Sequence, residues 1–144
     1  TLSSSSAASD VYKRQSLQKK YEIANQRKHE KMNFEQVQLY FRGACTYKQW
    51  WDAVCEAARR MDFAWVSLKT KELDGTIRTE VWRAADSNYD LSRIVVMTIP
   101  INGNGVERLH EFEIAISVDS SYESVGYRAT LFNRLIDEHT IVYS

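Results

Sequence analysis

Three neighbouring ionisable side chains in the C-terminal half could carry acid–base chemistry. Glu111 and Glu113 are two residues apart in a segment with strand-like alternation, which would place both carboxylates on one face, ~7 Å apart. His110 directly precedes them. Paired carboxylates on a solvated sheet face are more common than catalytic pairs. We therefore expect no catalytic residue, and a small enzyme that uses these three side chains stays an open alternative.

Aromatic residues supply the second candidate site. Trp65 and Trp82 fall in two expected strands, each on the face opposite a neighbouring valine, and Arg83 could hold an anion beside Trp82. If helices cover the aliphatic face, the two indoles share the other face. That face could form a small-molecule pocket, a dimer surface, or a second small core. Trp65, Trp82 and Arg83 are the expected ligand-binding residues.

Histidine and cysteine spacing gives no metal-binding motif. The three histidines lie far apart in the chain, and Cys45 and Cys55 do not form a CxxC pattern. Cys55 lies near the edge of an apolar stripe and is expected to behave as a small hydrophobic residue. The Asn-Gly-Asn-Gly run at 102–105 lacks the lysine and hydroxyl of a phosphate-binding loop, so we expect a turn. The sequence predicts neither a metal nor a cofactor.

The composition is typical of a globular domain. The 144 residues are 44% hydrophobic and 26% charged and include one proline, which excludes collagen-like and largely disordered classes. Lys plus Arg and Asp plus Glu are both 19, and zero net charge disfavours a nucleic-acid-binding protein. No apolar run approaches the ~20 residues that span a bilayer. Two cysteines are too few for a disulfide scaffold, which favours a reducing compartment.

Two helices are expected at the start of the globular part. The first spans roughly 33–42, with Asn33 as its N-cap. The second spans 47–61, where Thr46 and Gln49 have the spacing of a capping box. Its apolar residues recur at helical spacing on one face.

The tryptophan pair in the second helix and a third helix complete the helical pattern. Trp51 belongs to the apolar stripe, whereas Trp50 faces about 100° away and is expected to pack on the first helix. A long helix follows a capping box formed by Ser120 and Glu123. Its apolar stripe consists of Tyr122, Val125, Ala129, Phe132 and Ile136.

Four strands are expected between the second and third helices. Their ranges are 63–70, 76–83, 92–100 and 108–118. In the first, Phe63 and Val66 are expected on opposite faces. Asp74-Gly75 predicts a hairpin between the first two strands. Because tight turns join consecutive strands, we expect an antiparallel meander with helices on one face only, which is an α+β fold.

The first 32 residues are expected to lie outside this domain. Residues 1–15 show no helical or strand period and resemble the adapter-like tails of some conceptual translations, so we expect a non-native or disordered leader. Residues 16–32 are expected to form a basic helical connector whose apolar stripe is too thin for a core helix. The globular domain is then expected over 33–144.

Four segments carry a resemblance to a known family: WWDAVCEAARRMDFAWVSL (50–68), the acidic-Gly hairpin at 74–75, VWR (81–83) and LFNRLIDEH (131–139). Residues 33–138 thereby resemble the GAF-like cytosolic domain that follows the last membrane helix of some bacterial MraY/WecA-type sugar-phosphate transferases. Those enzymes load N-acetylhexosamine phosphate onto undecaprenyl phosphate. The resemblance implies a GAF-like four-stranded antiparallel sheet with helices on one face. It carries over no catalytic residue, because the family's aspartates and Mg²⁺ belong to the membrane part.

The resemblance implies a non-catalytic regulatory or assembly module, the C-terminal fragment of such a transferase. Its partner would be the upstream membrane domain of the same parent chain, and its place the cytoplasmic side of the inner membrane. The basic connector fits a segment just inside a membrane. The alternative is a GAF-type small-ligand sensor from a soluble signalling protein. A homodimer and a small ligand stay open as partners, and no nucleic acid is expected.

Overall fold

The computed structural model describes residues 2–85, 90–101, 109–118 and 121–139. The chain divides into two compact units, residues 1–32 and 33–144. The first unit belongs to helix α1 (Leu2–Arg42), whose last residues enter the second. The second unit continues with α2 (Tyr47–Arg60), β1 (Phe63–Lys71), β2 (Ile77–Arg83), the 3-10 turn η1 (Leu91–Arg93), β3 (Ile94–Ile101), β4 (Leu109–Ser117) and α3 (Tyr122–Glu138).

The four strands form one antiparallel sheet in the order β2-β1-β4-β3. The expected α+β class is confirmed, but the expected meander is wrong, because β1 and β4 pair at the centre. Turn signals specify only the hairpin partners β1–β2 and β3–β4. How the two hairpins join depends on burial, and the central strands β1 and β4 hold the most buried side chains.

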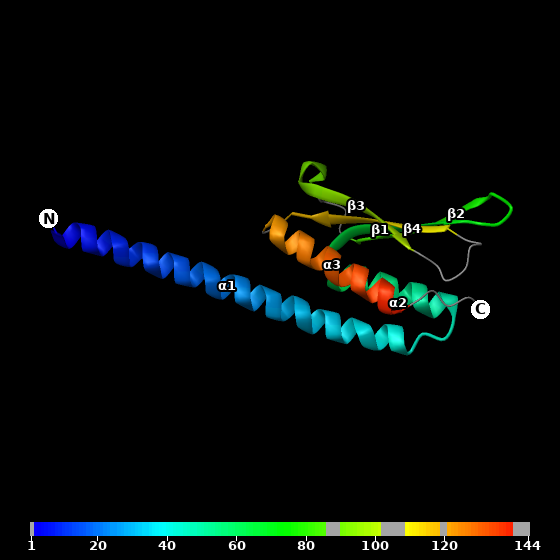
Figure 1. Cartoon of the computed structure of the whole chain (residues 1–144), viewed down its shortest axis with the longest axis horizontal. Coiled ribbons are helices and arrows are strands. Elements are labelled where there is room, and N and C mark those ends of the chain that lie inside the picture. Colours follow the sequence, from blue (N-terminus) through cyan, green and yellow to red (C-terminus); the bar gives the residue numbers. More distant parts are fainter. Residues whose placement is uncertain (1, 86–89, 102–108, 119–120, 140–144) are drawn as a thin grey trace. The chain divides into compact units, whose positions relative to one another are not determined.

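The helices of the second unit cover one face of the sheet (Figure 1). Phe34, Val37 and Phe41 from the end of α1 are buried with α2 and α3 in a single core. The sheet contributes residues that point to the helices, among them Phe112 and Ile114. Among the described residues of the second unit, no helix lies on the opposite face, so these residues leave that surface of the sheet uncovered.

Helix α1 begins earlier than the sequence pattern indicated. It starts at Leu2 and is helical through Asn33, which is therefore not an N-cap. The Asn33 amide is used elsewhere: its Nδ2 donates to the carbonyl of Arg60 at 3.4 Å. No glycine or proline lies between residues 2 and 42, so nothing in the backbone chemistry ends the helix before Gly43.

Helix α2 confirms the expected N-terminal cap. The side chain of Thr46 accepts the N–H of Gln49, whose Oε1 accepts the N–H of Cys45 at 2.8 Å. The burial of the two tryptophans is the reverse of the expectation, because Trp50 and not Trp51 is the fully buried one. Trp50 is 1% exposed and donates its indole N–H to the His139 carbonyl at 3.1 Å, while Trp51 is half-buried.

Strand β1 departs from simple alternation at its first residues. The register shifts between Phe63 and Trp65, which places Phe63 on the same side as Val66. Phe63 is buried in the core, with its ring 5.3 Å from that of Phe132. The expectation that Phe63 faces away from Val66 is therefore wrong, because a bulge adds one residue to the strand.

The hairpin at Asp74-Gly75 is confirmed. Gly75 has φ of +86°, a left-handed conformation that glycine adopts without steric cost. Asp74 accepts the backbone N–H of Thr76 at 2.9 Å and its hydroxyl at 2.6 Å. The expected turn at 102–105 lies outside the described residues.

Helix α3 is capped one residue later than expected. Ser121 is the N-cap and its Oγ accepts the N–H of Ser124 at 3.1 Å, whereas Ser120 lies outside the described residues. The stripe from Val125 to Ile136 is buried. Tyr122 is 76% exposed and does not join it.

Candidate functional site

The uncovered side of the sheet is the candidate functional surface. Residues that are directly opposite one another in neighbouring strands share a face, so the register defines this surface. We call this surface the open face. Its members are Trp65, Ser67, Lys69 and Lys71 of β1; Ile77, Thr79, Val81 and Arg83 of β2; Leu109, Glu111, Glu113 and Ala115 of β4; and Val96, Thr98 and Pro100 of β3.

Large apolar side chains project from the open face into solvent. Ile77 and Leu109 are each 69% exposed, Val96 is 50% exposed and Val81 is 48% exposed. Antiparallel sheets often leave one face in water, but that face is normally polar. Four exposed aliphatic side chains on one such face are instead typical of a surface that another molecule covers.

Trp65 lies on the central strand β1, near one end of the open face. It pairs with Arg83 of β2 and with Ala115 of β4. Its indole N–H donates to Glu113 Oε1 at 3.2 Å, so the ring extends from β1 across to β4. The partly buried ring thereby covers Ala115, which is 0% exposed.

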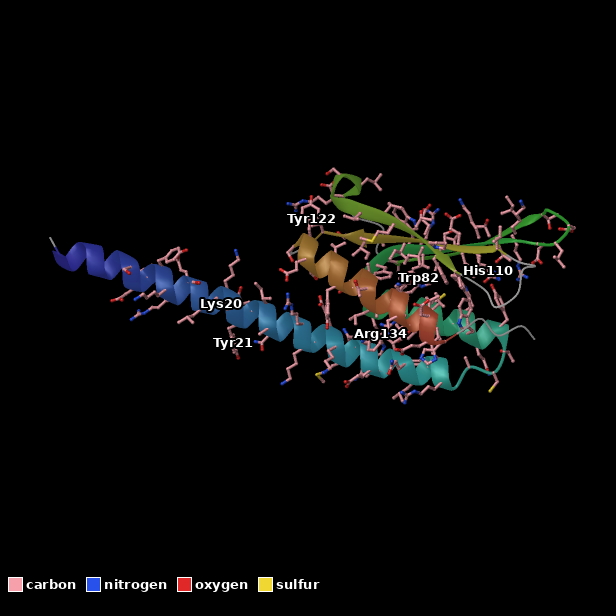
Figure 2. The ribbon with its side chains drawn as sticks, in the orientation of Figure 1. Lys20, Tyr21, Trp82, His110, Tyr122 and Arg134 are labelled. Atoms are coloured by element: carbon pink, nitrogen blue, oxygen red, sulfur yellow. The ribbon has the colours of Figure 1, made fainter. Side chains whose placement is uncertain are left out.

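Trp82 lies on the other face of the sheet, which corrects the expectation that both indoles share one face. Trp82 pairs with Val66, a core residue, and packs against the core. Figure 2 shows it on the helix side of the sheet. Trp82 buries more apolar area there than Val81 would, since an indole is larger than an isopropyl group. Of the three expected ligand-binding residues, the structure brings together only Trp65 and Arg83.

The three candidate acid–base residues also separate. Glu111 and Glu113 share the open face, as expected. His110 points to the helix side, where its Nδ1 is 2.9 Å from the Thr70 hydroxyl and the side chain is buried. A proton could not pass directly between His110 and either carboxylate, because the sheet lies between them.

The cysteines form no common site. Cys45 is exposed before α2, whereas Cys55 is half-buried within it. Burial, together with the carboxylates of Asp52 and Glu80, raises the pKa of the Cys55 thiol to about 12. No group of three potential metal ligands occurs in the part of the chain that the structure describes.

Arg128 is a buried residue that the sequence pattern did not single out. Its guanidinium donates to three backbone carbonyls: Met61 at 2.8 Å, Ser117 at 3.3 Å and Ser124 at 3.4 Å. It thus joins α3 to the end of α2 and to the end of β4. The sequence did contain a signal for its burial, because Arg128 is three residues after Val125 and therefore shares the apolar face of the helix.

The expected basic connector is helical throughout as part of α1. Leu17 and Tyr21 are 65% and 68% exposed, which agrees with a stripe too thin for a core helix. Lys20 and Tyr21 project from this helix in Figure 2. Within the described ranges, no helix has the length and apolar character that crossing a membrane requires.

Comparisons with family models, with curated proteins and with solved structures found no match to this chain.

Proposed function

We propose that this chain is a non-catalytic assembly module that binds a protein surface through the open face. The observation that carries the proposal is the group of exposed aliphatic side chains on a sheet whose other face is fully used by helices. Covering such side chains gains about 25 cal/mol for each Å² of apolar surface removed from water. Trp65, on the central strand β1, adds the kind of residue that is enriched in protein interfaces.

Charges among these apolar side chains would give the interaction its specificity. Lys69 and Lys71 on β1, with Glu111 and Glu113 on β4, form two adjacent columns of opposite sign. Such patterns select the partner and its orientation more than they add affinity. A small-ligand site on the two tryptophans is not favoured, because Trp65 and Trp82 occupy opposite faces.

For the parent protein, we propose the transferase context that the sequence resemblance implies. The basic helical segment that precedes Asn33 supports it, because excess Lys and Arg mark the cytoplasmic flank of membrane helices. The coding sequence upstream of the codon for Ser16 tests this part. Several apolar stretches of ~20 residues there would support it. A soluble neighbouring domain or a start codon close to residue 16 would contradict it.

The open face itself is tested by substitution in the complete parent chain. Val81→Asp and Leu109→Asp each place a charge on the face, and Tyr122→Asp is the matched control at an exposed apolar residue of α3. We expect the two open-face variants to lower the assembled mass measured by native mass spectrometry, while the control keeps it. Assembly that is unchanged in both open-face variants, with folding intact, would contradict the proposal.

A further inference from the structure

We infer that the open face binds a second copy of the same chain, with the two sheets face to face around a two-fold axis parallel to the strands, between β1 and β4. This inference rests on the proposed function, since it names the partner of the same surface. The strand register fixes the relative positions of the charged and apolar side chains on the face, and these positions indicate the axis.

The central charges occupy the two middle strands at matching heights. Lys69 of β1 pairs directly with Glu111 of β4, and Ser67 of β1 pairs with Glu113. Both Lys69 and Glu111 are exposed. The face therefore has a positive column and a negative column on either side of its midline.

A two-fold axis along that midline exchanges the two columns between copies. Lys69 of one copy then faces Glu111 of the second copy, and Glu111 faces Lys69. Each attractive contact occurs twice, because a two-fold interface presents the same patch on both subunits. Ser67 faces Glu113 of the second copy, where its hydroxyl can donate to the carboxylate.

A two-fold axis perpendicular to the strands gives the opposite result. It would place β4 of one copy over β4 of the other, so that Glu111 and Glu113 face carboxylates. Like charges brought together in an interface cost several kcal/mol. The charge pattern therefore selects the axis that is parallel to the strands.

Apolar and alkyl contacts complete this arrangement, since the register places Leu109 over Lys71 and Val96 over Arg83 of the second copy, whose alkyl stems can cover them. The Trp65 ring reaches across the midline toward Glu113, so the two indoles of a dimer meet near the axis. Val81 on β2 pairs in register with Ser67, and Thr98 on β3 pairs with Glu113. The same axis brings Val81 over Thr98 of the second copy, whose methyl group offers it an apolar contact.

The size of the face fits a weak, reversible dimer. Four strands about 4.8 Å apart and about seven residues long at about 3.3 Å each give a projected area of roughly 440 Å² per copy. The accessible area that two copies bury is larger than twice this value, because side chains roughen the surface. That places the dimer near the lower limit of about 1,000 Å² for specific interfaces.

Charge complementation between variants of the full chain tests the inference. In a dimer of the Lys69→Glu variant, a carboxylate at residue 69 faces the Glu111 carboxylate of the second copy. In a dimer of the Glu111→Lys variant, an ammonium group at residue 111 faces the Lys69 ammonium group of the second copy. We expect each variant alone to dimerise at least about tenfold more weakly than the unmodified chain, because two repulsive contacts replace two attractive ones. An equimolar mixture should recover the dimer, since every contact between the two variants joins opposite charges.

Sedimentation velocity from about 1 μM to about 500 μM covers the affinity that an interface of this size supports. Lys48→Glu is the matched control, since Lys48 is an exposed residue of α2 on the helix side. It should dimerise as the unmodified chain does. Circular dichroism and thermal unfolding verify that every variant is folded, because like charges directly opposite in a sheet are also slightly destabilising.

Three outcomes would overturn the inference: a folded, unmodified chain that stays monomeric throughout, a dimer that persists in both single variants, or single-variant monomers that do not associate when mixed. None of these decides the proposed function. If Val81→Asp still disrupts assembly of the parent, the open face binds a protein other than a second copy. If neither experiment responds to open-face changes, both proposals fail.

Discussion

The indole N–H of Trp65 donates to Glu113 Oε1 across 3.2 Å, joining the two central strands on the face opposite the described helices of the second unit. Trp65 also pairs with Arg83 on β2 and Ala115 on β4. One side chain thus bridges the two central strands near one end of the open face. The hydrogen bond holds the indole ring across the two strands, and tryptophan is a residue type enriched in protein interfaces.

We expect the bond between Trp65 and Glu113 to contribute measurable coupling to stability. Trp65→Phe keeps an aromatic ring but removes the donor, and Glu113→Ala removes the acceptor. A double-mutant cycle on the free energy of unfolding should give a coupling of about 0.5–1.5 kcal/mol, the net value of a typical hydrogen bond. Urea unfolding of the two single variants and the double variant measures it.

The same cycle with Glu111→Ala is the control, because Glu111 is exposed on the same strand and face but does not bond Trp65. Its coupling with Trp65→Phe should be close to zero. Equal coupling for Glu111 and Glu113 would show that general electrostatics, and not this hydrogen bond, holds the ring.

The helices and strands were largely predictable because local chemistry specifies them. Thr46 has the spacing of a cap, and its side chain accepts the N–H that the capping pattern predicts. Gly75 has the positive φ that the Asp-Gly pair indicates. In β4, buried Phe112 lies between the more exposed Glu111 and Glu113, as the alternation predicts.

The face of β2 could not be predicted in the same way. Alternation shows that Val81 and Trp82 point to opposite sides, but not which of them meets the helices. Pairing with β1 decides this question, since Trp82 is opposite Val66. The bulge before Trp65 is likewise invisible to periodicity. Which of the expected site residues share a face therefore depended on long-range register: Trp65 and Arg83 lie on one face of the sheet and Trp82 on the other.

Arg128 should be a large contributor to stability. Its guanidinium donates to three main-chain carbonyls, and Arg128→Met would keep the apolar stem while leaving those carbonyls without their donor. We expect a loss of about 2–4 kcal/mol in the free energy of unfolding. Chemical denaturation measures it, with Arg134→Met as the control on the same helix.

Arg134 has a 63% exposed side chain, so its replacement should cost less than about 0.5 kcal/mol. Arg128→Lys should be intermediate, because an ammonium group cannot reproduce the planar fork of the guanidinium. If Arg128→Met and Arg134→Met were equally stable, the buried carbonyl contacts would carry no net free energy.

The two cysteines should differ strongly in reactivity. Thiolates are the reactive species, and the Cys55 pKa is raised to about 12 by burial and by Asp52 and Glu80. At pH 8 the Cys45→Ser variant, which retains only Cys55, should react slowly with a disulfide reagent until it is unfolded. The Cys55→Ser variant retains the exposed Cys45 and should react promptly. Equal rates in the folded variants would contradict the assigned burial of Cys55.

His139 gives the fold a pH-dependent contact. Its ring stacks on Phe41 at 5.2 Å, and burial, with the nearby Arg42, lowers its pKa below the ordinary value of 6.5 although Glu138 acts in the opposite direction. The unfolded chain therefore binds a proton more readily than the folded chain does. Folding stability from this residue is fully present above pH 6.5 and falls as the pH drops through the lowered pKa.

His139→Phe removes the titrating group and keeps a ring that can stack on Phe41. Between pH 7.5 and pH 5, we expect the stability of the unmodified chain to decrease relative to this variant, because only the unmodified chain must keep an unprotonated imidazole against Phe41. Urea unfolding of both proteins at each pH measures the difference, and His110 cancels because both proteins contain it. A difference that does not change with pH, or that grows in favour of the unmodified chain on acidification, would show that protonated His139 is accommodated in the folded state.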